Sequence, residues 1–162
     1  MGARRTEDER PQLGAALRQA WVGYRLRLDK AMREAGFDDS GMPDGRILHI
    51  CAKATGVTIS DVGREVGITR QGASKAVNRL CERGYLELRP SPADGREKVV
   101  HLTARGDAYL AAQHRAARRL LHDIRSEVGE EAVDALYRLL DALGTDEVPR
   151  LREYLRNLQA SP

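Results

Sequence analysis

The 162-residue sequence is poor in aromatic residues and in cysteine. One Trp, one Phe and five Tyr make up only 4% of it, so Leu, Ala and Val must supply most of the packing, which suits helices. The two cysteines, Cys51 and Cys81, form neither a CxxC pair nor a metal-ligand spacing. These absences argue against a disulfide framework or a metal site, and they favour a protein of the reducing cytoplasm.

Long apolar segments and enzyme motifs are also missing. No apolar run approaches the roughly 20 residues that a membrane-spanning helix needs, and the N-terminal sequence MGARRTEDERPQL lacks the apolar segment of a signal peptide. The sequence has no GxSxG, HExxH or P-loop, and no paired carboxylates in an apolar setting. We therefore expect no membrane segment, no enzymatic activity and no cofactor.

What is present is a globular composition with an uneven distribution of charge. The sequence is 41% hydrophobic and 31% charged, which is enough to bury a core, and its length corresponds to one domain or to a domain with extended arms. The net charge is only +3, but residues 70–105 contain eight basic residues against four acidic ones. Such a concentration of positive charge is expected of a phosphate-binding face.

Apolar periodicity predicts helices on both sides of this basic stretch. Between Pro11 and Gly36, apolar residues recur at steps of three and four, as in an amphipathic helix. A short, mostly apolar helix is predicted for RILHICAKA, residues 46–54. Further helices are predicted after Thr103, over residues 130–143 and from residue 147 to about residue 159.

The middle of the sequence predicts a helix-turn-helix. The segment from Thr58 to Asp61 resembles a capping box with Asp in place of the usual Glu, and it predicts a helix that Gly67 ends. A possible strand of two residues precedes it at 57–58. Thr69 then caps a second helix over residues 70–83, whose buried face is predicted to be Ala73, Ala76, Val77 and Leu80.

The other face of the helix at 70–83 contains side chains that can donate hydrogen bonds, and its first acid is Glu82. A solvated helix usually mixes Glu with Lys, whereas a helix that reads the major groove of DNA uses Arg for guanine and Asn or Gln for adenine. Small polar residues and backbone amides at its N-terminus suit phosphates. The predicted DNA-binding residues of this helix are Thr69, Arg70, Gln71, Gly72, Ser74, Lys75, Asn78 and Arg79.

A hairpin is predicted over residues 85–102. Residues 85–89 alternate as in a strand, residues 90–95 are dense in turn formers, and residues 98–102 form the returning strand. Asp94, Arg96 and Lys98 would lie near its tip. An arginine there can enter a narrow minor groove, where the negative potential is concentrated.

These pieces resemble the MarR family of winged helix-turn-helix regulators. The match runs through TISDVGREVGITRQGASKAVNRLCERGYLELRPSPADGR and VVHLTARG, and the flanking helices occur in the family's order. Its most specific part is the wing, where DGR and LTARG match the family's Asp-x-Arg and Leu-Thr-x-x-Gly. By this resemblance Asp94 orients Arg96, and Arg96 probes the minor groove.

The resemblance implies a mainly α fold with a small β-hairpin wing. Residues 1–36 would form an arm and a dimerisation helix, residues 44–106 the winged helix-turn-helix lobe, and residues 107–162 the C-terminal dimerisation helices. It also implies a homodimer that binds a pseudo-palindromic double-stranded operator and is usually a repressor. A small aromatic or apolar effector would release it, and Trp21, Tyr24 and His49 are the predicted lining of the effector site.

Several alternatives stay open at this point. The winged helix can serve as an architectural or protein-interaction module, and a thiol-responsive regulator would use Cys51 or Cys81. Neither cysteine is at the position, early in the first helix, that the family's peroxide sensors use. Trp21 and Tyr24 can equally be aromatic residues of a dimer core, and His49 a packed or hydrogen-bonded histidine.

Overall fold

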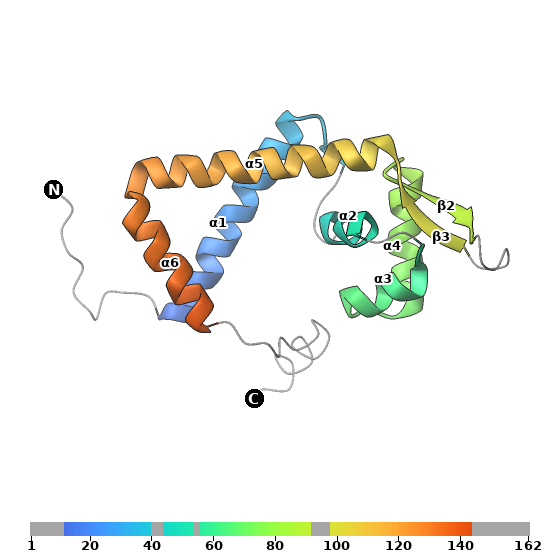
Figure 1. The fold of residues 1–162 in the computed structure, drawn as a ribbon, viewed down its shortest axis with the longest axis horizontal. Coiled ribbons are helices and arrows are strands. Elements are labelled where there is room, and N and C mark those ends of the chain that lie inside the picture. Colours follow the sequence, from blue (N-terminus) through green and yellow to red (C-terminus); the bar gives the residue numbers. More distant parts are fainter. Residues whose placement is uncertain (1–11, 40–43, 54–55, 92–97, 144–162) are drawn as a thin grey trace.

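The computed structural model describes residues 12–39, 44–53, 56–91 and 98–143. A long helix, α5, joins the two regions of the molecule (Figure 1). One region is a lobe of helices and a small sheet at the right of Figure 1. The other consists of helices at the two ends of the described chain. The mainly α architecture with a small antiparallel sheet confirms the predicted fold class.

The end helices are α1 (Leu13–Glu34) and α6 (Glu130–Leu143), and α5 (Ala104–Val128) extends from the lobe to α6. Helix α1 crosses α5 and packs against it. Helix α5 has Thr103 as its N-cap, and the Thr103 side chain accepts a hydrogen bond from the Gly106 amide. The predicted boundaries at 130 and 143 are confirmed, whereas the predicted arm at 1–10 and helix at 147–159 lie outside the described residues.

The lobe contains α2 (Asp44–Lys53), α3 (Ile59–Val66) and α4 (Arg70–Glu82). Its sheet consists of β1 (Val57–Thr58), β2 (Leu86–Pro90) and β3 (Lys98–Leu102), all antiparallel in the order β1-β3-β2. Helix α4 ends one residue earlier than predicted, at Glu82, and β2 begins one residue later, at Leu86. The predicted hairpin is thus one side of a three-stranded sheet, because the short strand before α3 pairs with β3.

One hydrophobic core fills the lobe and reaches α1 and α5. Helix α2 lies at its centre, with Ile47 and Leu48 fully buried. Aromatic residues meet where the lobe joins α1 and α5: Tyr109 of α5 is edge-on to both Phe37 and Tyr85, at centroid distances of 5.5 Å and 5.6 Å. Three of the seven aromatic residues of the sequence therefore meet at the junction between the two regions.

The end helices, in contrast, leave apolar side chains exposed. On α1 these include Trp21, Val22 and Leu26, and on α6 they include Leu136 and Leu140, with between 41% and 63% of each residue exposed. A monomer that exposed so many large apolar side chains on two helices would be unusual. The described helices include none that is long and apolar enough to cross a membrane.

Candidate nucleic-acid interface

Helix α4 is positioned by the capped helix before it and a tight turn. Thr58 Oγ1 accepts from the Asp61 amide at 3.2 Å, and the Asp61 carboxylate accepts from the Thr58 amide at 3.0 Å, which completes the predicted capping box. Gly67 then adopts a left-handed conformation, with φ of 79°. Gly63 allows the turn to fold back closely, because an added Cβ would lie 3.2 Å from the Ile68 carbonyl oxygen.

The N-terminus of α4 depends on Thr69 and Gly72. Thr69 Oγ1 accepts from the Gly72 amide at 3.1 Å, which confirms the predicted cap. A Cβ at position 72 would lie 3.3 Å from that same hydroxyl oxygen. Glycine at 72 therefore makes room for the cap, a role that the sequence alone did not predict.

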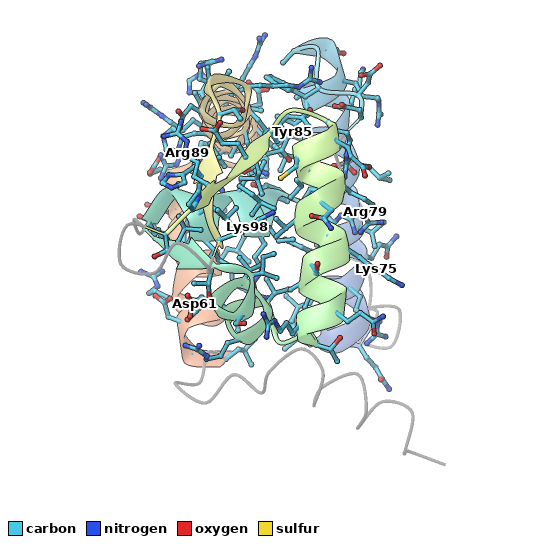
Figure 2. All side chains as sticks on the ribbon, turned by 90° about the vertical axis from the view of Figure 1, so that its right-hand side faces the viewer. Asp61, Lys75, Arg79, Tyr85, Arg89 and Lys98 are labelled. Carbon is cyan, nitrogen blue, oxygen red and sulfur yellow. The ribbon has the colours of Figure 1, made fainter. Side chains whose placement is uncertain are left out.

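The two faces of α4 are as different as the sequence predicts. Ala73, Ala76, Val77 and Leu80 are all buried. The opposite face is polar, and its cations have no ion pair with any described residue. Figure 2 shows Lys75 and Arg79 along this helix, beside the hairpin of β2 and β3. The exposed residues of this face are Arg70, Gln71, Lys75, Asn78 and Arg79, with Ser74 half-buried.

The hairpin brings further cations to the same side of the molecule. Lys98 is exposed at the start of β3, opposite Pro90 at the end of β2 (Figure 2). Arg89 is paired with the Glu87 carboxylate of its own strand. Lys98 is thus the predicted wing residue that the structure brings toward α4, whereas Asp94 and Arg96 lie outside the described residues.

The root of the hairpin is fixed by Thr103 and Gly106. Thr103 donates its hydroxyl to the Gly84 carbonyl at 2.6 Å and its amide to the Tyr85 carbonyl at 3.1 Å. Gly106 is buried against Tyr85, and an added Cβ would overlap the Tyr85 carbonyl oxygen and the Leu102 side chain. The LTARG segment therefore anchors the wing to α5. From the residues alone, only the start of a helix after Thr103 was predicted.

A second site is a cavity of about 510 Å³ between α1, α2 and α5. It brings together the three predicted effector residues: the Trp21 and Tyr24 rings stack at a centroid distance of 6.0 Å, and His49 lies on the facing helix. His49 Nε2 is 2.8 Å from Gln113 Oε1. The cavity is also lined by Arg25, Arg46 and Lys53 against one acid, Asp29, which the sequence reading did not identify.

The cysteines are poorly suited to sensing oxidants. Burial, with a smaller contribution from Cys81, raises the pKa of the Cys51 thiol to about 11. Burial, with Glu82 and Glu87 nearby, also raises the pKa of Cys81. Because the thiolate is the reactive form, these environments argue against the thiol-responsive alternative. Among the described residues, no three His, Cys, Asp or Glu side chains are grouped so that they could hold a metal ion.

Comparison with known proteins gives matches to one family. Residues 40–97 match the model of the MarR family. Over 140 residues the chain is 24% identical to the HTH-type transcriptional regulator PetP of Rhodobacter capsulatus, and the alignment covers 86% of this chain and 82% of PetP.

Solved structures share the fold at low sequence identity. Streptococcus pneumoniae FabT in complex with DNA has a TM-score of 0.70 at 22% identity, and the match covers 91% of this chain and 97% of FabT. The reduced form of Escherichia coli MarR has a TM-score of 0.69 at 20% identity, covering 85% of this chain and 99% of MarR. The family match over residues 40–97, which contain the helix-turn-helix, assigns this segment to the MarR family, and the chain as a whole is similar to the transcriptional regulator PetP.

Proposed function

We propose that the chain binds duplex DNA by placing α4 in the major groove. The observation that carries this proposal is the exposed face of α4, where Arg70, Lys75 and Arg79 have no ion pair with any described residue and the first acid is Glu82. Cations without partners in the protein are available to phosphates and base edges. FabT, which shares the fold, has been solved in complex with DNA, which supports this proposal.

The side chains of α4 divide into base readers and phosphate contacts by their chemistry. Arg70 and Arg79 can each form two hydrogen bonds to guanine, and Gln71 and Asn78 can do so to adenine. Lys75 and the capped N-terminus suit phosphates, where the helix dipole attracts anions. The proposed DNA contacts are Thr69, Arg70, Gln71, Gly72, Ser74, Lys75, Asn78, Arg79 and Lys98, with Arg96, oriented by Asp94, from the segment outside the described residues.

We further propose that two copies associate through the end helices, which residues 1–36 and 107–162 supply. Exposed Val22 and Leu26 on α1 and exposed Leu136 and Leu140 on α6 support this proposal, because burial of such surfaces drives association. A two-fold dimer would present two α4 helices to half-sites about 34 Å apart, one turn of DNA. The operator would then be a pseudo-palindrome.

The cavity beside Trp21, Tyr24 and His49 is proposed as the effector site of a repressor. It lies between the lobe helix α2 and the helices α1 and α5, so a molecule bound there contacts both regions. The stacked rings favour an aromatic or apolar compound. Three cations against one acid, together with the buried Arg25 Nε that has no hydrogen-bond partner, favour an acidic one.

Selection of bound duplexes from a random or genomic pool tests DNA reading directly. We expect a site with two half-sites about one turn apart and affinity that falls steeply with salt, because each neutralised phosphate releases counterions. Arg79→Ala should relax the base preference at one position of each half-site, and Lys75→Ala should weaken binding to all sequences by a similar factor. Equal binding of every duplex, with little salt dependence, would exclude the proposal.

A matched control is Arg118→Ala, since Arg118 is exposed on α5 about 20 Å along the helix from its first residue. It should bind the selected site as the wild type does. If the α4 variants also retained full operator binding, the architectural or protein-interaction alternative would be favoured instead.

The effector proposal can be tested through Trp21, the single tryptophan of the chain. A library of small aromatic acids should contain compounds that quench Trp21 fluorescence and release the selected duplex at the same concentrations. His49→Ala should weaken both effects, whereas His122→Ala, on the exposed surface of α5, should change neither. Release of DNA without a change at Trp21 would argue for another site.

A further inference from the structure

Asp39, in the connection between α1 and α2, forms hydrogen bonds with residues from distant parts of the chain. Its carboxylate accepts from the Tyr85 hydroxyl and from Arg105 Nη2, which lies 3.1 Å from each oxygen. Its backbone carbonyl accepts from Arg83 Nη1. The same Arg83 nitrogen also donates to the buried Asp44 carboxylate at 3.0 Å.

The residues of this cluster lie in or beside the ends of four different elements. Arg83 is the residue at the C-terminal end of α4, and its Nε also donates to the Arg79 carbonyl at 3.1 Å. Tyr85 immediately precedes β2, Asp44 begins α2, and Arg105 lies in the first turn of α5. One short segment of chain thus connects the end of α4, the start of the wing and the first turn of the long helix.

The surroundings make this cluster well defined. Tyr85 is fully buried, and the Arg105 guanidinium lies 4.7 Å from the centroid of its ring. Desolvation tends to raise the pKa of Asp39, but the hydrogen bond from Tyr85 and the charge of Arg105 outweigh it, so the pKa lies below its usual value. Hydrogen bonds between charged groups are shorter and stronger than neutral ones.

The position of the cluster matters because only two stretches of chain join the lobe to the end helices. One is the connection that contains Asp39, and the other is α5, which begins beside Arg105. Both are held to the end of α4 at Arg83 and Tyr85. A change in the tilt of the lobe against α1 and α5 would therefore have to break these bonds.

We propose that Asp39, Arg83 and Arg105 act as positioning residues that hold α4 at a fixed angle to α1 and α5 and so determine which half-site spacing the dimer accepts. This inference rests on the proposed DNA-binding function. Helix α4 extends about 20 Å from Arg83 to Arg70, at 1.5 Å per residue. A tilt of about 10° at Arg83 moves the other end by roughly 3 Å, close to the ~3.4 Å rise of one base pair.

The test is operator discrimination by Asp39→Asn, with Asp38→Asn as the matched control. Asp38 is the preceding residue, is exposed as Asp39 also is, and has no ion pair with any described residue. Each protein is titrated with the selected operator and with versions whose half-sites are one base pair closer or further apart. We expect the wild type and Asp38→Asn to lose at least tenfold in affinity on the altered spacings, and Asp39→Asn less than threefold.

A purely structural role of Asp39 predicts a different result. Loss of folded protein would weaken binding to all three operators by the same factor and leave the discrimination unchanged, which would overturn the proposal. The slope of affinity against salt should stay at the wild-type value, since none of these residues contacts phosphate. Arg105→Lys keeps the charge, so it should retain part of the discrimination between operator spacings that Asp39→Asn loses. It serves as the second variant if Asp39→Asn does not fold.

A measurement without DNA separates this inference from the proposed function. In a background without Cys51 and Cys81, a dye attached to Lys75→Cys accepts energy from Trp21 on α1. The distribution of distances between α1 and α4 should be narrow with Asp39 and clearly broader with Asp39→Asn. Equal widths would overturn the positioning role even if an operator were found. A broader distribution in Asp39→Asn, with no operator found, would support the positioning role and exclude sequence-specific DNA binding.

Discussion

The lobe and the end helices differ in how far their large apolar side chains are buried. Within the lobe, from α2 to β3, no described large apolar side chain is exposed, and Ile47, Leu48 and Leu80 are completely buried. Every exposed large apolar side chain of the described chain lies between residues 13 and 26 or between residues 128 and 143. The lobe buries its apolar side chains within one chain, whereas the end helices leave many of theirs exposed.

This difference has a consequence for how the two regions respond to mutation. Changes in the lobe should act on the free energy of unfolding, because its core is packed within the chain. Changes at the exposed apolar residues of the end helices should act on association, because these side chains are largely uncovered in the described chain.

The largest expected effect is in the lobe. Leu48→Ala removes a fully buried side chain from α2 and should lower the free energy of unfolding by about 3 kcal/mol, within the range for Leu→Ala in cores. Leu139→Ala, at a residue that is 41% exposed on α6, should cost about 1 kcal/mol or less in a monomer. Urea denaturation at low protein concentration measures both, and equal losses would remove the distinction between the regions.

The next effect is on association. Leu26→Lys combined with Leu140→Lys places two charges on the exposed apolar faces and should raise the dimer Kd by roughly a hundredfold, about 2.7 kcal/mol. Analytical ultracentrifugation measures it, and circular dichroism should show an unchanged helix content. The control is Arg27→Ala, about 100° further around α1. A double variant that stays dimeric would contradict the proposed interface.

A smaller effect is expected where the wing meets α5. Gly106→Ala forces a methyl group against the Tyr85 carbonyl oxygen and the Leu102 side chain, and should destabilise the protein by about 2 kcal/mol. Gly23→Ala, at a helical position of α1 with no neighbouring atom within 4 Å, should instead stabilise it by up to about 1 kcal/mol. Thermal denaturation of both variants tests the predicted opposite signs.

The smallest effect concerns the junction of the two regions. Because the pKa of Asp39 lies below its usual value of 3.8 in the folded state, its ionised form stabilises the fold above that value, and this contribution is lost as the pH falls through the folded pKa. Between pH 6 and pH 3 the wild type should lose more stability than Asp39→Asn. Asp38→Asn should follow the wild type, and identical curves for all three would exclude a contribution from Asp39.

The sequence predicted most of the lobe because the signals there are local. The cap at Thr69, the apolar spacing from Ala73 to Leu80 and the capping box at Thr58 each involve residues within one helix or next to it. The structure confirms all three. The reading of α4 as a DNA-binding helix stays a prediction, since it rests on the chemistry of the exposed face.

Contacts between distant residues could not be predicted in this way. Asp39 lies in a polar connection where nothing in the local pattern distinguishes it from Asp38, and its partners are 44 to 66 residues further along the chain. The role of Gly106 is equally invisible, because it depends on how closely Tyr85 approaches α5. The cations Arg25, Arg46 and Lys53 come from two helices, and only the folded structure brings them to one cavity.

The length of α5 is itself a functional quantity if the end helices pair. Its 25 residues span about 37 Å as one uninterrupted rod, with the wing at one end and α6 at the other. Removing or adding one residue would shift the two ends by only about 1.5 Å but would rotate them by about 100° against each other. Changes in length are therefore tolerable only in near-whole numbers of turns. A relative that reads a differently spaced operator would more easily change the angle at the junction than the length of this rod.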